Sequence, residues 1–464
     1  MAEQGRFLTG STMGHVVRMT LAGTLGITFV FLVDAANLFW IAQLDQPRLM
    51  AAIGFAFAIQ YFSVSAGIGL MIASTALVSR RIGEGDRELA RRNATSAAMI
   101  AFVFQSIVAA MIFIYRHEIV ALSGATGETA ALAARYLAMS VPTLGIMAIS
   151  MIANGTLRAV GDGKRSMLVT LTSGGVAMVI DPIMIVTFGW GLDGAAIGLN
   201  ISRVVMLFMA LRFAIGTHNL LALPSVSGFL ETAKPYFQIA LPAILAQMAT
   251  PVGNYMLTAV MAPFGDEAMA GWAVVGRLTV VAFGGIFSLS GAIGGIFGQN
   301  YGARSYDRLR CTYRDALIFG FVYTAVTWGV LILCKPLILS GFALAPMGIE
   351  VVTAFLYVGA GGFVFAAALF VATTAFNALA RPTWATLTSW VRDGVMTLPF
   401  ALVLSGWFDA PGVIYAQAIV TVLVGGVAAW LGWRYVCSLG REQLPKLDLA
   451  PPRPYAHADR FRRR

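Results

Sequence analysis

Two aspartates interrupt long apolar stretches and are the strongest candidates for chemistry in the sequence. Asp34 lies in GITFVFLVDAANLFW, and Asp181 lies in MVIDPIMIV, directly before Pro182. A carboxylate in apolar surroundings is costly to ionise, so each group could exchange a proton near physiological pH or bind a cation directly. Pro182 breaks the helical hydrogen-bond ladder and frees backbone carbonyl groups beside Asp181. We predict proton or cation coupling at both residues; the alternative is a protonated carboxyl group bonded to a neighbouring helix.

Three further charged residues lie inside apolar stretches: Arg277, Arg392 and Asp393. Successive residues of an α-helix point about 100° apart, so Arg392 and Asp393 need not pair. We expect these residues to have structural roles or to set the charge of a cavity. Other charged residues fall near the ends of apolar stretches, and we interpret them as anchors at a membrane surface. This group comprises Arg135, Arg158, Asp193, Arg203, Asp266, Glu267, Glu350 and Asp409.

The sequence has no pattern typical of an enzyme or of ATP-driven transport. It contains no GxxxxGK[ST] motif for binding nucleotide phosphates. The histidines are expected at helix ends, in loops or in the tail, where they cannot form a metal cluster inside the membrane, and the cysteines form no CxxC pair. These residues are His15, His117, His218 and His457, and Cys311, Cys334 and Cys437. We therefore predict a secondary active transporter that is not an enzyme and has no metal or cofactor beyond its coupling ion.

The composition indicates an integral membrane protein. Of 464 residues, 58% are hydrophobic and 12% are charged, against about 25% charged in soluble domains, and the mean hydropathy is +0.78. This composition excludes a soluble enzyme, a nucleic-acid-binding domain and a secreted disulfide-rich protein. The net charge of +10 is explained by basic loops on the inner side of a membrane rather than by a nucleic-acid partner.

Apolar runs bounded by charge, proline and glycine predict twelve membrane-spanning helices in an all-α fold. The loop at 80–92 contains five arginines, whereas alternate loops contain few basic residues. This pattern places both termini in the cytoplasm and requires an even number of spans. The predicted spans are 14–42, 50–79, 93–115, 130–158, 166–190, 193–215, 233–262, 268–298, 312–334, 350–380, 384–407 and 412–436.

The two halves of the chain repeat each other. Asp34 aligns with Asn254 at an offset of 220, and Trp190 aligns with Trp407 at an offset of 217. Each half has six spans, so both enter the membrane in the same direction, and transporters commonly bind substrate between such parallel repeats. We predict an amino-terminal lobe at 1–217, a cytoplasmic linker at 218–232, a carboxy-terminal lobe at 233–437 and a basic cytoplasmic tail at 438–464.

Several stretches resemble the multidrug and toxic compound extrusion (MATE) family over essentially the whole chain. They include LVDAANLFWIAQLD, ALVSRRIGEGD, NGTLRAVGDGKRSM, VIDPIMI, LPAILAQMATPVGNYML and GQNYGARSYDRLR. The resemblance implies a V-shaped, monomeric bundle of twelve helices that exports small organic cations and amphipathic drugs in exchange for protons or sodium ions. It makes Asp34 and Asp181 the cation and proton site of the amino-terminal lobe. With no membrane-embedded acidic residue in spans seven or ten, the chain is similar to the DinF-like bacterial branch, which implies a multi-pass protein of the bacterial inner membrane.

Departures from the family pattern favour protons over sodium as the coupling ion. The family's sodium site uses an Asn and a Thr at positions that are Ala177 and Leu199 here, and sodium needs several oxygen ligands. Asn154 and Asn200 are possible auxiliary cation ligands. The first span also lacks the proline at which the family bends, although Gly23 and Gly26 would permit bending.

The substrate is not readable from the sequence, but polar residues in spans are candidate contacts in a central cavity. These are Asn37, Gln247, Asn254, Arg277 and Asn377. Each could instead join helices through hydrogen bonds.

Two alternative functions stay open: a sodium-coupled exporter of the same family, and a lipid or metabolite flippase of the same superfamily. Flippases typically use several cavity arginines, and this chain offers mainly Arg277. Membrane lipids are expected to surround the protein.

Overall fold

The computed structural model describes residues 5–44, 46–342 and 344–440, and these residues form helices and short connections without a β-sheet. Helices dominate because every backbone N–H and C=O group inside a membrane must be satisfied within its own segment. Most of the predicted tail, including His457, lies outside the described residues.

The amino-terminal half runs through six long helical segments. After the short η1 (Arg6–Leu8), α1 begins behind Ser11, whose hydroxyl accepts a hydrogen bond from the Gly14 amide at 3.2 Å. In this structure α1 is one unbroken helix from Thr12 to Ala42. The elements are α1 (Thr12–Ala42), α2 (Pro47–Gly83), α3 (Arg87–Ile114), α4 (Arg116–Leu122), α5 (Gly127–Ser140), η2 (Val141–Thr143), α6 (Leu144–Ala159), α7 (Gly163–Pro182), η3 (Ile183–Thr187) and α8 (Gly191–Gly216).

The carboxy-terminal half follows the same order. Its fifth span, like that of the first half, contains a π-helical stretch, η6 here and η3 before. The elements are α9 (Val226–Met261), η4 (Ala262–Phe264), α10 (Asp266–Gly302), α11 (Tyr306–Leu333), α12 (Lys335–Phe342), α13 (Pro346–Ala354), η5 (Phe355–Gly359), α14 (Ala360–Ala378), α15 (Pro382–Trp390), η6 (Val391–Met396) and α16 (Thr397–Ser438).

The described helices are consistent with twelve membrane spans. Ten segments are long and apolar enough to cross a membrane, and one of these, Pro382–Ser438, has 57 residues. The backbone breaks within it at Phe408 and Asp409, where Asp409 has φ 53°, so it contributes two spans. The 36-residue α9 is the twelfth. The break falls between the predicted spans 384–407 and 412–436.

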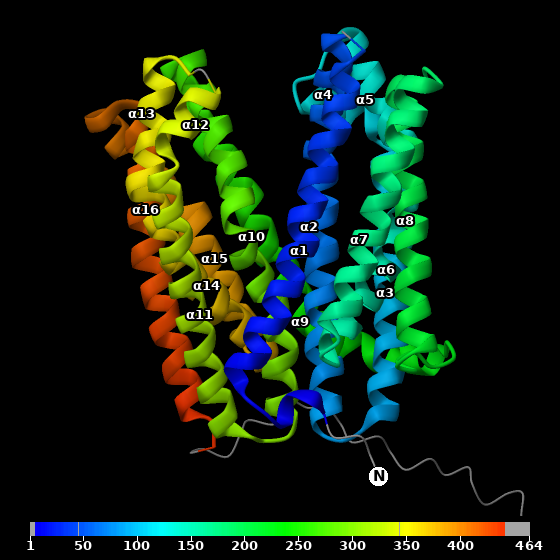
Figure 1. Ribbon diagram of the computed structural model, residues 1–464. Helices are drawn as coiled ribbons and strands as arrows, with labels where there is room; N and C mark the ends of the chain where they lie inside the picture. Colours follow the sequence, from blue (N-terminus) through cyan, green and yellow to red (C-terminus); the bar gives the residue numbers. More distant parts are fainter. Residues whose placement is uncertain (1–4, 45, 343, 441–464) are drawn as a thin grey trace, which may run out of the picture.

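The helices form two lobes that lie together at one end and diverge toward the other (Figure 1). The first described residues and the end of α16 lie at the joined end. The packing is duplicated, as the repeat predicts: α1 packs on α7 and α10, and α9 packs correspondingly on α15 and α2. Thus α1 and α9 each contact both lobes. Large apolar side chains such as Leu25, Phe208 and Val326 are exposed on the outer helices, as expected for surfaces that face lipid.

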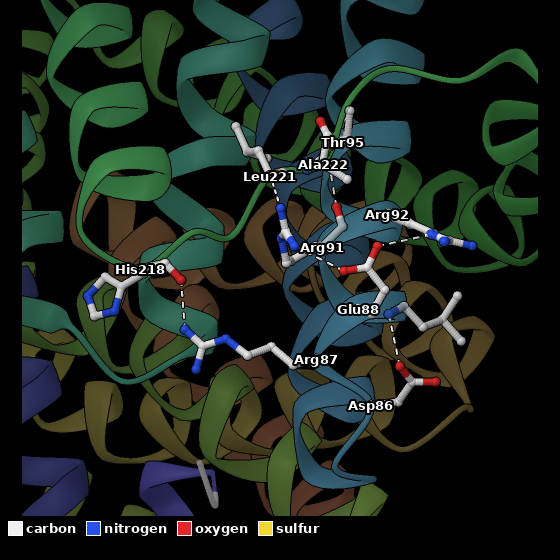
Figure 2. Close-up of polar contacts among 10 residues, drawn as sticks. Asp86, Arg87, Glu88, Arg91, Arg92, Thr95, His218, Leu221 and Ala222 are labelled. Carbon is white, nitrogen blue, oxygen red and sulfur yellow. Dashed lines mark hydrogen bonds and ion pairs between the residues drawn. The ribbon is translucent and has the colours of Figure 1, made fainter. Parts of the chain in front are cut away.

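The connection between the halves is attached to the start of α3 (Figure 2). Arg87 donates to the His218 carbonyl oxygen at 2.6 Å, and Arg91 donates to the Leu221 carbonyl oxygen at 3.2 Å. Thr95 exchanges two hydrogen bonds with the backbone of Ala222. The predicted linker therefore follows the surface of the amino-terminal lobe before α9 begins at Val226.

Candidate functional site

A hydrogen bond joins the first and fifth spans at Asp181. The Asn37 Nδ2 atom on α1 donates to Asp181 Oδ2 on α7 at 2.9 Å, and both side chains are buried. The Oδ1 atoms of both residues are also buried and have no hydrogen-bond partner among the described residues. The pair therefore presents two oxygen acceptors: the Asp181 carboxylate can take up a proton, and both oxygens can contact a cation.

Asp34 lies one helical turn before Asn37 on α1. Its side chain is exposed, and it makes no hydrogen bond or ion pair with any other described residue. It interacts electrostatically with Asp181. Two carboxylates that share a region favour retention of a proton or cation between them, because two unscreened negative charges repel each other. The structure thus brings together the two predicted coupling residues and one predicted cavity residue, Asn37.

Local backbone features place the Asp181 carboxylate. Asp181 and Pro182 end α7, and the chain continues as the π-helix η3, in agreement with the missing N–H of proline. Across from it, α8 presents Gly198. A Cβ atom at residue 198 would lie 2.1 Å from Asp181 Oδ1, so a glycine is required there for the carboxylate to approach α8.

An arginine network beside this site was missed by the sequence analysis. Arg203 was interpreted as a surface anchor, but it is only 6% exposed. Its guanidinium group donates to the Ser140 carbonyl oxygen at 2.6 Å, to Thr143 Oγ1 at 2.7 Å and to Gln60 Oε1 at 3.0 Å. The available signal was its place near the middle of the 26-residue α8, where an anchor at a membrane surface does not belong.

The two predicted auxiliary ligands differ in their surroundings. Asn200 is engaged at both ends of its amide: it donates to the Met139 carbonyl oxygen at 2.8 Å and accepts from Thr143 at 2.7 Å. Asn154 on α6 is 2% exposed, and its Oδ1 atom has no partner within the described chain. Of the two, only Asn154 offers an oxygen that is not already hydrogen-bonded.

The carboxy-terminal lobe contains a charged pair that the sequence analysis did not expect. Arg392 donates to both oxygens of Asp393, at 2.7 and 2.8 Å, although adjacent residues of an α-helix point apart. The two residues lie in the π-helix η6, and the long arginine side chain folds back onto its neighbour. Thr250 on α9 also donates to Asp393, at 3.2 Å. A carboxylate of span eleven therefore reaches span seven.

The remaining predicted cavity residues do not form one cluster with Asn37. Asn254 and Arg277 are exposed, and Gln247 is half-buried. Asn377 is buried and lines a cavity together with Arg158. Arg158 is half-buried and contacts both lobes, so its interpretation as a surface anchor was wrong.

Comparison with known proteins identifies the family. A sequence model named MatE matches residues 24–183 and 242–403, one match in each half of the chain. The protein belongs to the MatE family. It is therefore a membrane transporter of this family, as its resemblance implied.

Individual relatives are similar to this chain over nearly its whole length. The FAD transporter of Shewanella oneidensis is 24% identical over 92% of this chain and 96% of its own. The multidrug export protein MepA of Staphylococcus haemolyticus is 23% identical over 92% and 94%, respectively. Among solved structures, a MOP superfamily transporter from Pyrococcus furiosus has a TM-score of 0.87 at 22% identity, covering 95% of this chain and 99% of that chain. A Vibrio cholerae MATE transporter has a TM-score of 0.84 at 21% identity, covering 91% and 96%. These structures share the two-lobed fold.

Proposed function

We propose that this MatE protein exports cationic amphipathic compounds in exchange for protons, and that Asp34 and Asp181 couple the two fluxes. The observation that carries the proposal is the contact of Asp181 with Asn37, one turn from Asp34. It connects a pair of membrane carboxylates to α1, a helix that packs against both lobes. Intramembrane carboxylates are expensive and commonly mark ion or substrate pathways.

The exchange follows from competition for negative charge. When the pair is deprotonated, it attracts a cationic substrate; when a proton binds, the substrate loses that attraction and leaves. Proton and substrate then disfavour each other by the same coupling free energy, whichever binds first. The membrane potential adds roughly 2.3 kcal/mol per transferred charge per 100 mV. If more positive charge enters as protons than leaves with the substrate, the potential therefore helps to drive substrate export.

The substrate class is supported by relatives of this chain. The relative from S. haemolyticus is named the multidrug export protein MepA, and this name agrees with an exporter of many compounds. The S. oneidensis relative is named for FAD, so a metabolite is the second candidate substrate, in line with the flippase-like alternative.

The basic loops support an inner-membrane protein with both termini in the cytoplasm. In that orientation the joined end of the lobes faces the cytoplasm and the diverging end faces outward. We propose that the protein acts as a monomer, with the lobes bounded at 1–217 and 233–437, the linker at 218–232 and the tail at 438–464.

Sodium is the alternative coupling ion, and one observation favours it. The unpartnered Oδ1 atoms of Asn37, Asp181 and Asn154 are oxygens of the kind that a hard cation binds. Against it, the positions that would complete the sodium site are Ala177 and Leu199, and Asn200 is already hydrogen-bonded.

Dye efflux from intact cells tests the proposal. Cells producing wild-type protein, Asp34→Asn or Asp181→Asn are loaded with a fluorescent cation in sodium-free buffer, with and without a protonophore. Wild-type export that collapses with protonophore, and that both variants lack, is the expected result. Asp193→Asn, an aspartate paired with Arg135 at the start of α8, is the matched control and retains export. Export that requires added sodium would replace the proton by sodium, and full export by Asp34→Asn would contradict the coupling site.

A further inference from the structure

Arg158 is a half-buried cation whose guanidinium group is largely unpaired. Its Nε atom donates to Ser166 Oγ at 3.0 Å. Its Nη1 and Nη2 atoms donate to no acceptor within the part of the chain that the structure describes, and no described carboxylate forms an ion pair with it. A guanidinium group removed from bulk water is costly unless an anion or hydrogen-bond acceptors compensate it.

Other inward-facing arginines are compensated. Arg80 donates to the Ala378 carbonyl oxygen at 2.9 Å and stacks over the Tyr301 ring at 5.0 Å. Arg203 makes three hydrogen bonds, and Arg392 is paired with Asp393. Each of these guanidinium groups has at least one Nη hydrogen bond to a described residue, although the buried Arg80 Nε atom has no partner there. Arg158 differs because neither of its Nη atoms has such a bond, which calls for a ligand.

The unpaired group adjoins two small cavities between the lobes. The cavities have volumes of about 20 and 40 Å³, and Arg158 lines both. One is also lined by Gly23, Ser166 and Ser288, and the other by Thr75, Thr374 and Asn377. Asn377 is only 6% exposed, and its Nδ2 group donates no hydrogen bond to another described residue. The hydroxyl groups of Ser288, Thr75 and Thr374 already donate to backbone carbonyl oxygens. The Ser166 hydroxyl and the Asn377 amide are left to donate hydrogen bonds to an anion.

The Arg158 side chain extends from the amino-terminal lobe to the carboxy-terminal lobe. The residue lies in the last turn of α6, but a Cβ atom at Gly291 of α10 would lie 2.8 Å from its Nη1 atom. Glycine at 291 thus leaves room for a guanidinium group of the amino-terminal lobe to reach the carboxy-terminal lobe. A ligand held by this group would contact both halves of the joined end.

We propose that Arg158 is the centre of an anion-binding site between the lobes. Its ligand is a small anion, or the single carboxylate or phosphate group of a larger compound. The guanidinium fork suits such groups, and a cavity of about 40 Å³ has room for a few water-sized atoms but not for a drug molecule. The site is separate from Asp34 and Asp181, and it stands whether or not protons drive transport.

Ligand-dependent thermal stability of the purified full-length protein tests the site. The reference buffer contains a bulky sulfonate as its only anion, and chloride, inorganic phosphate or acetate is titrated at constant ionic strength. For the wild-type protein we expect at least one anion to raise the unfolding midpoint by about 2 °C or more near saturation. Stabilisation by chloride or phosphate would indicate a free anion, and stabilisation by acetate alone would indicate the acidic group of an organic compound.

Variants locate the effect. Arg158→Gln is expected to weaken the apparent affinity at least tenfold, Arg158→Lys to weaken it less, and Ser166→Ala to weaken it several-fold while keeping the charge. Arg434→Gln, which removes a positive charge from an exposed position on α16, is the matched control and keeps wild-type affinity. If Arg158→Gln does not fold, Ser166→Ala and Gly291→Ala carry the test.

The proposal fails if no anion stabilises the wild-type protein, or if Arg158→Gln or, in its place, both substitute variants respond like wild type. The assay needs no ion gradient, so a failure of proton-coupled dye export leaves its result intact.

Discussion

At the scale of single residues, the proposed coupling depends on the Asp181 carboxylate and its immediate contacts. Asp181 is held by the Asn37 amide at 2.9 Å and has room only because residue 198 is glycine. A hydrogen bond to a charged group contributes about 1.5–3 kcal/mol. Small changes at these positions should therefore alter coupling without disturbing the apolar core of either lobe.

Adding one methyl group to α8 should displace the carboxylate. In Gly198→Ala the new Cβ atom would lie 2.1 Å from Asp181 Oδ1, so the carboxylate must move and break its bond to Asn37. We expect export to fall at least tenfold and the thermal unfolding midpoint to drop by a few degrees. Gly216→Ala in the same helix meets no atom within 4 Å and should be neutral or slightly stabilising. Equal export by the two alanine variants would show that this contact has no role.

Removing the donor to Asp181 tests the same contact from α1. Asn37→Leu keeps a similar volume but cannot donate to Asp181, so a buried carboxylate loses its one hydrogen bond to a described residue. We expect substrate export to fall about tenfold or more while the amount of protein in the membrane is unchanged, measured by initial efflux rates normalised to expression. Unchanged rates would mean that the Asn37 amide only links helices.

At the scale of elements, polar contacts hold neighbouring helices and loops in register. Arg203 connects α8 to α2, α5 and η2. Asp162, in the turn between α6 and α7, binds the Arg165 side chain at 2.5 Å and His218 of the interlobe connection at 2.7 Å. These contacts fix the frame within which α1 and α7 meet.

Truncating Arg203 should destabilise the amino-terminal lobe. Arg203→Met keeps much of the apolar stem but leaves Gln60 and Thr143 without their partner, so we expect a loss of about 3 kcal/mol. The measurement is the thermal or denaturant unfolding of the detergent-solubilised protein. A wild-type midpoint in Arg203→Met would indicate that water replaces the guanidinium group and that the network is not structural.

The Asp162 contacts should give stability that depends on pH. Burial alone would raise the pKa of Asp162, but hydrogen bonds from His218 and Arg165 outweigh it and lower the pKa below its usual 3.8. A lowered carboxyl pKa adds stability above about pH 4, and this stability is lost as the pH falls through the native value. We expect wild type to be more stable than Asp162→Asn at pH 7, with the difference shrinking toward pH 3. A difference that is constant with pH would exclude this contribution.

At the scale of the whole molecule, the sequence predicts the architecture better than the polar contacts. The apolar runs and the repeat anticipate two similar lobes, and DAPG marks the break at Phe408 and Asp409, because a span must stop where charge and proline replace apolar residues. The approach of Asp34 to Asp181 was anticipated through the family resemblance. Arg158 was misassigned, because a position near a helix end does not reveal which neighbouring helix covers it. Arg203 was misassigned although it lies near the middle of its helix. The Arg392–Asp393 pair was unexpected, because a π-helical stretch is not visible in hydrophobic periodicity.

The proposed exchange of protons for substrate can be followed with purified protein in sodium-free liposomes that enclose a pH-sensitive dye. Adding a membrane-impermeant cationic substrate on one side should move protons in the opposite direction at a rate proportional to the amount of wild-type protein. Asp34→Asn should abolish this movement and bind the substrate more weakly, because it lacks the negative charge. Proton movement by Asp34→Asn at the wild-type rate, or substrate transport by wild type with no proton movement, would contradict the account.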